Sequence, residues 1–157
     1  MINAPVDQTQ LQKDIETIYK SANEVNMEFN GDKFECIKFG TDKNLQEEYK
    51  YVNEDGKDIE EKDHLKDLGI QLSNDLTLSK HISKTVLTCR KTLGWIMRTF
   101  KTRNKYTMKV LWNSMIQSRL DYCSQLWSPS LQSEINNIED IQRQFTKRID
   151  GMEDISY

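Results

Sequence analysis

The residues with the most distinctive chemistry are cations that follow one another without an intervening acid. Between Asp75 and Asp121 the chain has no Asp or Glu, and nine cations run from Lys80 to Lys109. They are Lys80, Lys84, Arg90, Lys91, Arg98, Lys101, Arg103, Lys105 and Lys109. Lys and Arg make charge-assisted hydrogen bonds with phosphate and carboxylate oxygens. The run therefore predicts a polyanion, an acidic partner, or contact between this basic half and the acidic first half of the chain.

The spacing of these cations places several of them on one face of a helix. Ile82, Val86, Cys89, Leu93, Ile96 and Phe100 follow a helical period, and Met97 lies beside them. On the same wheel Lys80, Lys84, Lys91 and Arg98 fall on the opposite side. A helix over 79–101 with an apolar seam and a basic stripe is the prediction, and the stripe also fits an ordinary solvated surface.

The residue types that build most catalytic and metal sites are sparse or scattered. The three cysteines, Cys36, Cys89 and Cys123, form no CxxC pair, and the two histidines, His64 and His81, are far apart in sequence. The chain contains no Asp-Asp pair, and the acids of 42–63, such as Glu47 and Glu48, lie in a polar context. We expect no metal site, no cofactor and three reduced thiols.

Composition describes an ordinary polar globular protein with an uneven charge. Of 157 residues, 36% are hydrophobic and 30% are charged. Residues 1–78 carry 9 Lys and 18 acids, whereas residues 79–157 carry 13 basic residues and 7 acids. No apolar run approaches the roughly 20 residues of a membrane span, and no signal peptide is recognisable. We expect a soluble, intracellular protein that does not bind a membrane.

The acidic half is predicted to combine one helix with short strands. Leu11, Ile15, Ile18, Ala22, Val25 and Phe29 mark a helix over about 8–27, capped by Asp7 or Thr9. Strands are predicted over 34–39 and 49–52, the second turned through 53–56 into Ile59. A further short strand or hairpin arm covers 65–72, with Gly69 in its interior.

The basic half is predicted to hold three helices. After the helix over 79–101, Asn104 can cap a second one over 105–125 that is apolar on more than one face. Ser128 and Pro129 can start a third, which Gly151 would end. The expected fold is therefore α+β, with an N-terminal helix and small antiparallel sheet in domain 1–78 and a three-helix bundle in domain 79–157.

The order of short phrases along the chain resembles the reverse transcriptases of non-LTR retrotransposons of the jockey type. These phrases are Phe-Asn-Gly-Asp-Lys at 29–33, Asp-Leu-Gly-Ile at 67–70, Leu-Ser-Lys-His-Ile at 78–82, Leu-Gly-Trp-Ile-Met-Arg-Thr-Phe at 93–100, Leu-Asp-Tyr-Cys-Ser-Gln-Leu-Trp-Ser-Pro at 120–129 and Ile-Glu-Asp-Ile-Gln-Arg-Gln-Phe-Thr at 138–146. Their order and spacing carry the resemblance, which covers nearly the whole chain.

The resemblance implies a role for each half. Residues 8–40 look like the end of a polymerase palm, in which Lys33 would protonate the departing pyrophosphate of an intact enzyme. Residues 64–72 look like the primer grip, with Leu68 and Gly69 at the primer end. The helical half is similar to the thumb, whose cations Lys80, Lys84, Lys91, Arg98 and Lys101 would hold an RNA–DNA hybrid or another nucleic acid.

The chain departs from this family in lacking the catalytic carboxylates. Polymerase chemistry uses carboxylates to hold two Mg²⁺ ions, and the family's Ala-Asp-Asp turn is not in this sequence. We expect a fragment of an RNA-directed DNA polymerase that is inactive alone, begins at an internal methionine and ends within the thumb. The missing remainder of the polymerase is a possible partner. A non-catalytic structural or protein-interaction domain, or a relic without selected function, is the alternative.

Overall fold

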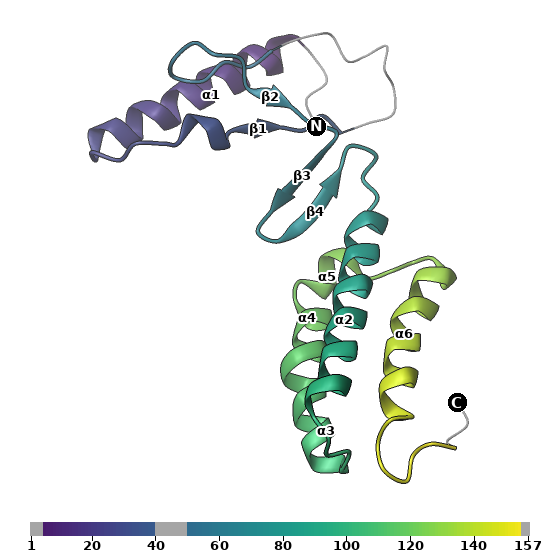
Figure 1. The fold of residues 1–157 in the computed structure, drawn as a ribbon. Coiled ribbons are helices and arrows are strands. Elements are labelled where there is room, and N and C mark those ends of the chain that lie inside the picture. The colour runs from purple at the N-terminus through teal and green to yellow at the C-terminus, as the bar shows by residue number, and fades with distance from the viewer. Residues whose placement is uncertain (1–4, 40–49, 155–157) are drawn as a thin grey trace. The chain divides into compact units, whose positions relative to one another are not determined.

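The computed structural model describes residues 5–39 and 50–154, with α-helices and two sheets of two strands each. This is the α+β composition that the sequence predicts. The chain divides into two compact units (Figure 1). The first unit comprises Met1–Asp67 and Ser73–Leu76, and the second, here called the helical unit, comprises Leu68–Leu72 and Thr77–Tyr157.

The first unit is built on helix α1, Pro5–Glu24. The predicted caps Asp7 and Thr9 are wrong, because the helix already begins at Pro5 and both residues lie inside it. The helix also ends earlier than predicted, since Asn26 takes a left-handed φ of 56° and the Met27 amide closes a turn onto the Ala22 carbonyl.

The buried side of α1 differs from the predicted stripe at one residue. Ile18 is exposed, whereas the neighbouring Tyr19 is 5% exposed. Its ring packs against Phe29 and Phe34 at centroid distances of 5.5 and 5.2 Å. Ala22 of the predicted stripe is buried and Leu11 and Ile15 are half-buried, so within α1 the prediction is wrong only at Ile18, where Tyr19 and its aromatic partners fill the core instead.

The first sheet is parallel, whereas the sequence predicts an antiparallel one. Strand β1, Glu35–Cys36, pairs with β2, Glu60–Glu61, in parallel register. Parallel strands need a long connection, and 23 residues separate Cys36 from Glu60. The predicted turn at 53–56 is present as an antiparallel bridge between Val52 and Asp58. Tyr49, at the start of the predicted strand, lies outside the described residues.

The second sheet contains β3, His64–Asp67, and β4, Ile70–Ser73. Leu68 and Gly69 form the turn between them, with φ values of 44° and 92°. Positive φ at both central residues is the geometry of a tight two-residue hairpin. The predicted strand or hairpin arm over 65–72 is thus a complete hairpin.

The helical unit begins with α2, Ser79–Thr99, which lies beside α6, Gln132–Thr146 (Figure 1). Its predicted apolar seam is buried: Ile82, Cys89 and Ile96 are among the core residues. The core also takes Ile70 from β4, together with Met108, Ile141 and Phe145. Helix α2 therefore has one face in the core and the opposite face in solvent.

The predicted second helix is divided into several segments. Helix α3, Lys105–Trp112, is followed by a π-helical turn at Asn113–Gln117, α4 at Ser118–Asp121 and α5 at Ser124–Trp127. Asn104 caps α3 as predicted, by accepting a 2.8 Å hydrogen bond from the Thr107 amide. The buried residues Leu111 and Ile116 are five apart, the step that a π turn accommodates.

The predicted start of the third helix is wrong. Ser128 closes α5 as its C-cap, and α6 begins at Gln132 after Leu131. The helix ends at Thr146 with Lys147 as C-cap, so Gly151, at a φ of 75°, lies in a turn beyond the helix instead of ending it. Ile141, Phe145 and Ile149 of the predicted stripe are buried.

Candidate nucleic-acid interface

The predicted basic stripe is present on α2. Lys80, Lys84, Lys91 and Arg98 are exposed, and Lys101 follows just beyond the helix end. Within 5–39 and 50–154, none of these five cations forms an ion pair. At 1.5 Å per residue the stripe from Lys80 to Arg98 is about 27 Å long. Four unpaired charges along this length form a line that fits a nucleic-acid backbone.

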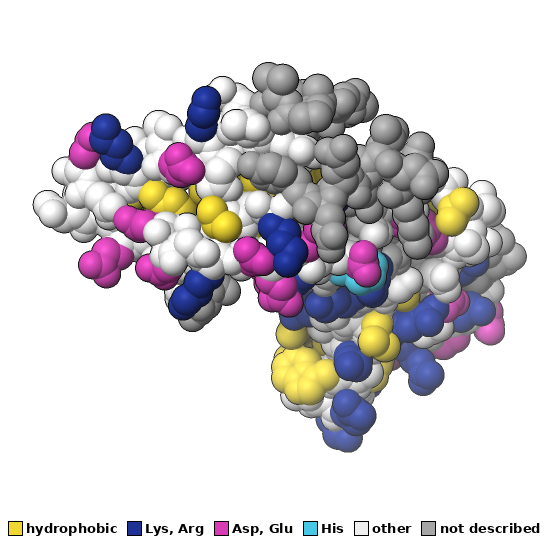
Figure 2. All heavy atoms as spheres, turned by 90° about the horizontal axis from the view of Figure 1, so that it is seen from above, with side chains coloured by type: hydrophobic (Ala, Val, Ile, Leu, Met, Phe, Trp, Pro, Cys, Tyr) yellow, Lys and Arg dark blue, Asp and Glu magenta, His cyan; other side chains and the backbone are white. Residues whose placement is uncertain are grey.

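Two large apolar side chains interrupt the stripe. Leu87 is 53% exposed and Trp95 is 44% exposed, and on the helical wheel both lie among the cations. The Trp95 ring meets Phe100 edge-on at a centroid distance of 5.9 Å, which leaves much of the indole in solvent. Figure 2 shows Lys and Arg side chains gathered over the helical unit with hydrophobic side chains among them. Cations interleaved with an exposed aromatic ring are typical of surfaces that bind single strands.

A groove between α2 and α6 extends the positive charge around the helix. Its volume is about 600 Å³, and its basic residues are Arg90, Lys147 and Arg148. Arg90 is positioned by Asp140, whose carboxylate lies 3.3 Å from the guanidinium. Leu93 and Met97 supply apolar lining, and Gly94 opens into the groove. The charge of the helical unit is therefore not confined to the predicted stripe.

Two hydrogen bonds hold the hairpin to the helices, and each of them involves one side chain of the helical segments. The Tyr122 hydroxyl donates to the Leu68 carbonyl at 2.7 Å. The Gln71 amide donates to His81 Nδ1 at 3.3 Å, and the His81 ring packs edge-on against Trp127 at 5.4 Å. Leu68 and Gly69, predicted to grip a primer end, are therefore part of the helical unit, with the Leu68 side chain in solvent.

The environment of His81 favours its neutral form. Burial lowers the pKa of this imidazole, and the nearby Lys84 ammonium lowers it further. The Nδ1 atom accepts the Gln71 hydrogen bond, so Nε2 carries the proton of the neutral ring. The neutral ring can therefore accept the hydrogen bond that joins strand β4 to the start of α2, next to the core contact of Ile70.

Lys33 belongs to the first unit, whereas the basic stripe belongs to the helical unit. It ends the 3-10 turn Gly31–Lys33 and is exposed, and its amide donates to the Asn30 carbonyl at 3.0 Å. Among the described residues, no three His, Cys, Asp or Glu side chains are grouped so that they would hold a metal ion. Glu47 and Glu48 lie outside the described residues.

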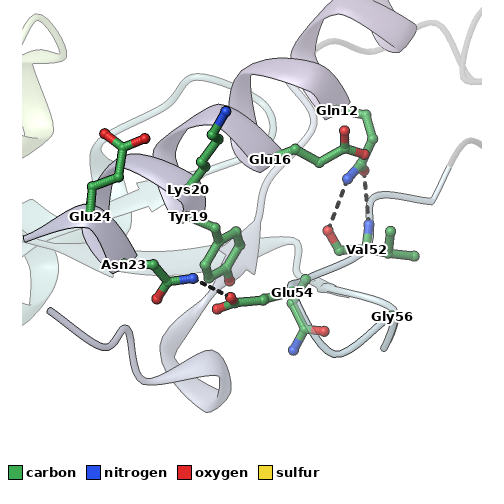
Figure 3. A pocket seen from close by; sticks show the side chains of 10 residues that line it. Gln12, Glu16, Tyr19, Lys20, Asn23, Glu24, Val52, Glu54 and Gly56 are labelled. Carbon is green, nitrogen blue, oxygen red and sulfur yellow. Dashed lines mark hydrogen bonds between the residues drawn. The ribbon is translucent and has the colours of Figure 1, made fainter. Parts of the chain in front are cut away.

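The first unit has a groove of its own, between α1 and the turn at 53–56 (Figure 3). The Gln12 amide binds the Val52 backbone twice, donating at 3.1 Å and accepting at 3.0 Å. Asn23 donates to Glu54 at 2.6 Å. Burial raises the pKa of the Tyr19 hydroxyl, which has no hydrogen-bond partner of ordinary geometry among the described residues. These contacts fasten the turn to α1.

The three thiols differ in their surroundings. Cys89 is fully buried in the core, Cys36 is half-buried and Cys123 is exposed, and all three are free. Burial raises the pKa of the Cys89 thiol, so this side chain acts as a small apolar core residue.

Over 5–39 and 50–154 the chain forms no helix that combines the length and apolar character needed to cross a bilayer.

Sequence reasoning missed three residues of this surface, Trp95, Lys147 and Arg148. Trp95 was detectable, because it follows Lys91 by four residues and so borders the stripe. Lys147 and Arg148 were detectable as an adjacent basic pair, but their position beside Arg90 depends on how α2 and α6 pack.

No protein-family model matches this chain, and no curated protein and no solved structure matches it either.

Proposed function

We propose that the helical unit binds the phosphate backbone of nucleic acid through the α2 stripe. The observation that carries the proposal is the line of Lys80, Lys84, Lys91 and Arg98, which are exposed and have no acidic partner among the described residues. Such a line attracts a polyanion and releases its counterions on binding. Lys101 extends the line past the helix end.

We further propose that this chain is the template–primer-binding portion of a reverse transcriptase of the non-LTR, jockey-like type. In this proposal α2, the α3 to α4 segment and α6 act as a three-helix thumb. Leu68 and Gly69 are the primer grip, which agrees with a tight turn whose backbone is anchored by Tyr122. Lys33 would act as a general acid only in an intact polymerase, and only that enzyme would require Mg²⁺. A protein with this role would act inside the cell. Its ligand would be an RNA–DNA hybrid, which is therefore the first ligand to test.

The second candidate is a non-catalytic domain that binds an acidic protein through the same face. Leu87 and Trp95 favour it, because exposed apolar side chains among cations also suit an acidic amphipathic helix. The two candidates differ in their ligand, and one titration separates them.

The test is a fluorescence anisotropy titration of a labelled RNA–DNA hybrid with the full chain at low salt. The proposal expects saturable binding without sequence preference. Absence of binding by a protein whose helices are folded by circular dichroism would overturn it in favour of the second candidate. A primer-extension assay with Mg²⁺ or Mn²⁺ addresses catalysis, and we expect no incorporation above a denatured control.

A further inference from the structure

A glycine occupies the middle of α2 at the point where the helix borders the groove with α6. Gly94 destabilises a helix relative to alanine, because its backbone is freer in the unfolded chain. Apart from the neighbouring residues and backbone of the helix itself, no atom of the described residues lies within 4 Å of the position that a Cβ would take at Gly94. Core packing therefore does not require a glycine here, and its smallness leaves the groove open.

The groove has an apolar floor and a cationic rim. Leu93 is in the core and Met97 is half-buried, so the floor offers aliphatic and thioether surface. Lys147 and Arg148 are exposed at the end of α6, and within the described part of the chain neither forms an ion pair. Arg90 completes the rim and is oriented by Asp140 and by the Asn137 amide oxygen, 3.4 Å from the guanidinium. None of the described residues that line the groove is acidic.

This combination suits a ligand with a flat apolar part and a phosphate. We infer that the groove holds one nucleotide unit of a single strand, with the base over Leu93, Gly94 and Met97 and the phosphate at Arg90, Lys147 and Arg148. The volume of about 600 Å³ lies in the usual range of small-ligand sites, about 300–1,000 Å³. A base can enter the groove only if it is unpaired, so the groove takes its nucleotide from a single-stranded segment.

The inference rests on the proposed nucleic-acid function and adds the type of strand and the place of one nucleotide. Lys91 and Arg98 lie three residues before and four residues after Gly94, on the adjoining side of the helix. A strand whose phosphates follow the stripe therefore passes the mouth of the groove. Trp95 is next to Gly94 in sequence and offers a stacking surface for a neighbouring base.

The decisive variant is Gly94→Leu, because it fills the groove without changing any charge. Since no atom of the described residues beyond the neighbouring residues and backbone of the helix lies within 4 Å of the new Cβ, we expect the helix to fold at least as well as in the wild type. Thr99→Leu is the matched control, since it adds the same side chain at an exposed position on the same helix. The double variant Lys147→Glu, Arg148→Glu tests the rim at exposed positions that leave the core intact.

The ligand is identified by NMR chemical-shift titration of the full chain with adenosine 5′-monophosphate, adenosine and inorganic phosphate. We expect the monophosphate to shift amides of 93–97 and 144–148 in the wild type and in Thr99→Leu. Gly94→Leu should abolish these shifts. An equal response to inorganic phosphate would reduce the groove to a simple anion site and overturn the inference, as would no response of the wild type to the monophosphate.

A second measurement separates this inference from the proposed function. Anisotropy titrations compare a single-stranded oligonucleotide with an RNA–DNA hybrid. We expect Gly94→Leu to lose at least about tenfold in affinity for the single strand and to keep its affinity for the hybrid, since the stripe is intact. Unchanged single-strand affinity in Gly94→Leu would overturn the inference alone, whereas a wild type that binds neither ligand would overturn the proposed function.

Discussion

The Tyr122 hydroxyl donates a 2.7 Å hydrogen bond to the backbone carbonyl of Leu68, 54 residues earlier in the chain. Leu68 is 82% exposed and adopts a φ of 44°, a left-handed conformation that costs a leucine about 1–2 kcal/mol. The ring of Tyr122 also lies 3.6 Å from the position of a Cβ on Gly69. Tyr122 thus holds the turn in a conformation that Leu68 alone would not favour.

Replacing Tyr122 by phenylalanine should destabilise the helical unit modestly. The variant keeps the ring beside Gly69 and loses one hydrogen bond at an exposed site, which contributes about 0.5–1.5 kcal/mol. Urea unfolding followed by tryptophan fluorescence measures the change. Tyr106→Phe is the control, since that side chain is exposed and its hydroxyl forms no hydrogen bond within the described part of the chain. An equal loss in both variants would contradict the role of the Leu68 contact.

The stability of the helical unit should fall as the pH is lowered from 7 toward 5. The pKa of His81 is lower in the folded protein than its usual value of about 6.5, so the unfolded chain binds the proton more readily. The contribution of neutral His81 to the free energy of unfolding is complete above about pH 6.5. It is lost as the pH falls toward the pKa of His81 in the folded protein. Protonation also removes the acceptor of the Gln71 amide.

Urea unfolding at several pH values checks this prediction. His81→Gln should remove most of the pH dependence between pH 5 and 7, and the same substitution at the exposed His64 is the control. A wild type whose stability is flat over this range would show that His81 is not the group that titrates.

Gln12→Ala should loosen the first unit and leave the helical unit unchanged. The variant removes two hydrogen bonds that pair the side chain with the Val52 backbone, a loss of roughly 1–3 kcal/mol. Amide hydrogen exchange should rise in α1 and in residues 50–59. The three tryptophans, Trp95, Trp112 and Trp127, lie in the helical unit, so their fluorescence transition should not move.

Gln10→Ala is the matched control for this measurement. Gln10 is exposed on the same helix, and within 5–39 and 50–154 its side chain donates to Asp14 alone, one turn away. We expect a change of at most about 0.5 kcal/mol, as for exposed pairs of this spacing. Equal increases in exchange for the two variants would mean that the Val52 contact does not fasten the turn.

Trp95→Ala should weaken single-strand binding with little effect on folding. Stacking of one base on an aromatic side chain contributes about 1–3 kcal/mol, and Trp95 is the most exposed of the described tryptophans. Anisotropy titration measures the loss, and ligand-induced quenching of wild-type fluorescence supports it. Tyr106→Ala, at an exposed position on α3, is the control. Unchanged affinity in Trp95→Ala would show that no base stacks on Trp95.

The parts of the fold that sequence reasoning predicted are those governed by local periodicity. Helix α2 follows the steps of three and four among Ile82, Cys89 and Ile96, and these residues are buried. Asn104 caps α3 because a side-chain oxygen at that point satisfies a free amide of the first turn. The basic stripe follows from the same wheel, so its residues were named from the sequence alone.

The parts that were missed depend on contacts between distant segments. Parallel pairing of Glu35 with Glu60 is decided by a long connection, not by either short strand. The π turn after Trp112 reflects a five-residue step that a regular helical pattern does not contain. Arg90 and Arg148 share a groove only because α2 packs against α6, which no local pattern shows.

The most direct measurement of the central claim is the salt dependence of hybrid binding by the wild type and by a stripe variant. Five contacting cations predict a slope of log affinity against log salt of about −4 to −5 for duplex. Lys84→Glu, Lys91→Glu, Arg98→Glu should reduce its magnitude by about 3 and abolish binding near physiological salt. The charge-matched control Lys13→Glu, Lys20→Glu, Lys57→Glu, at exposed positions of the first unit, should bind nearly as the wild type. A wild-type slope near zero, or equal loss in both triple variants, would contradict binding through the α2 stripe.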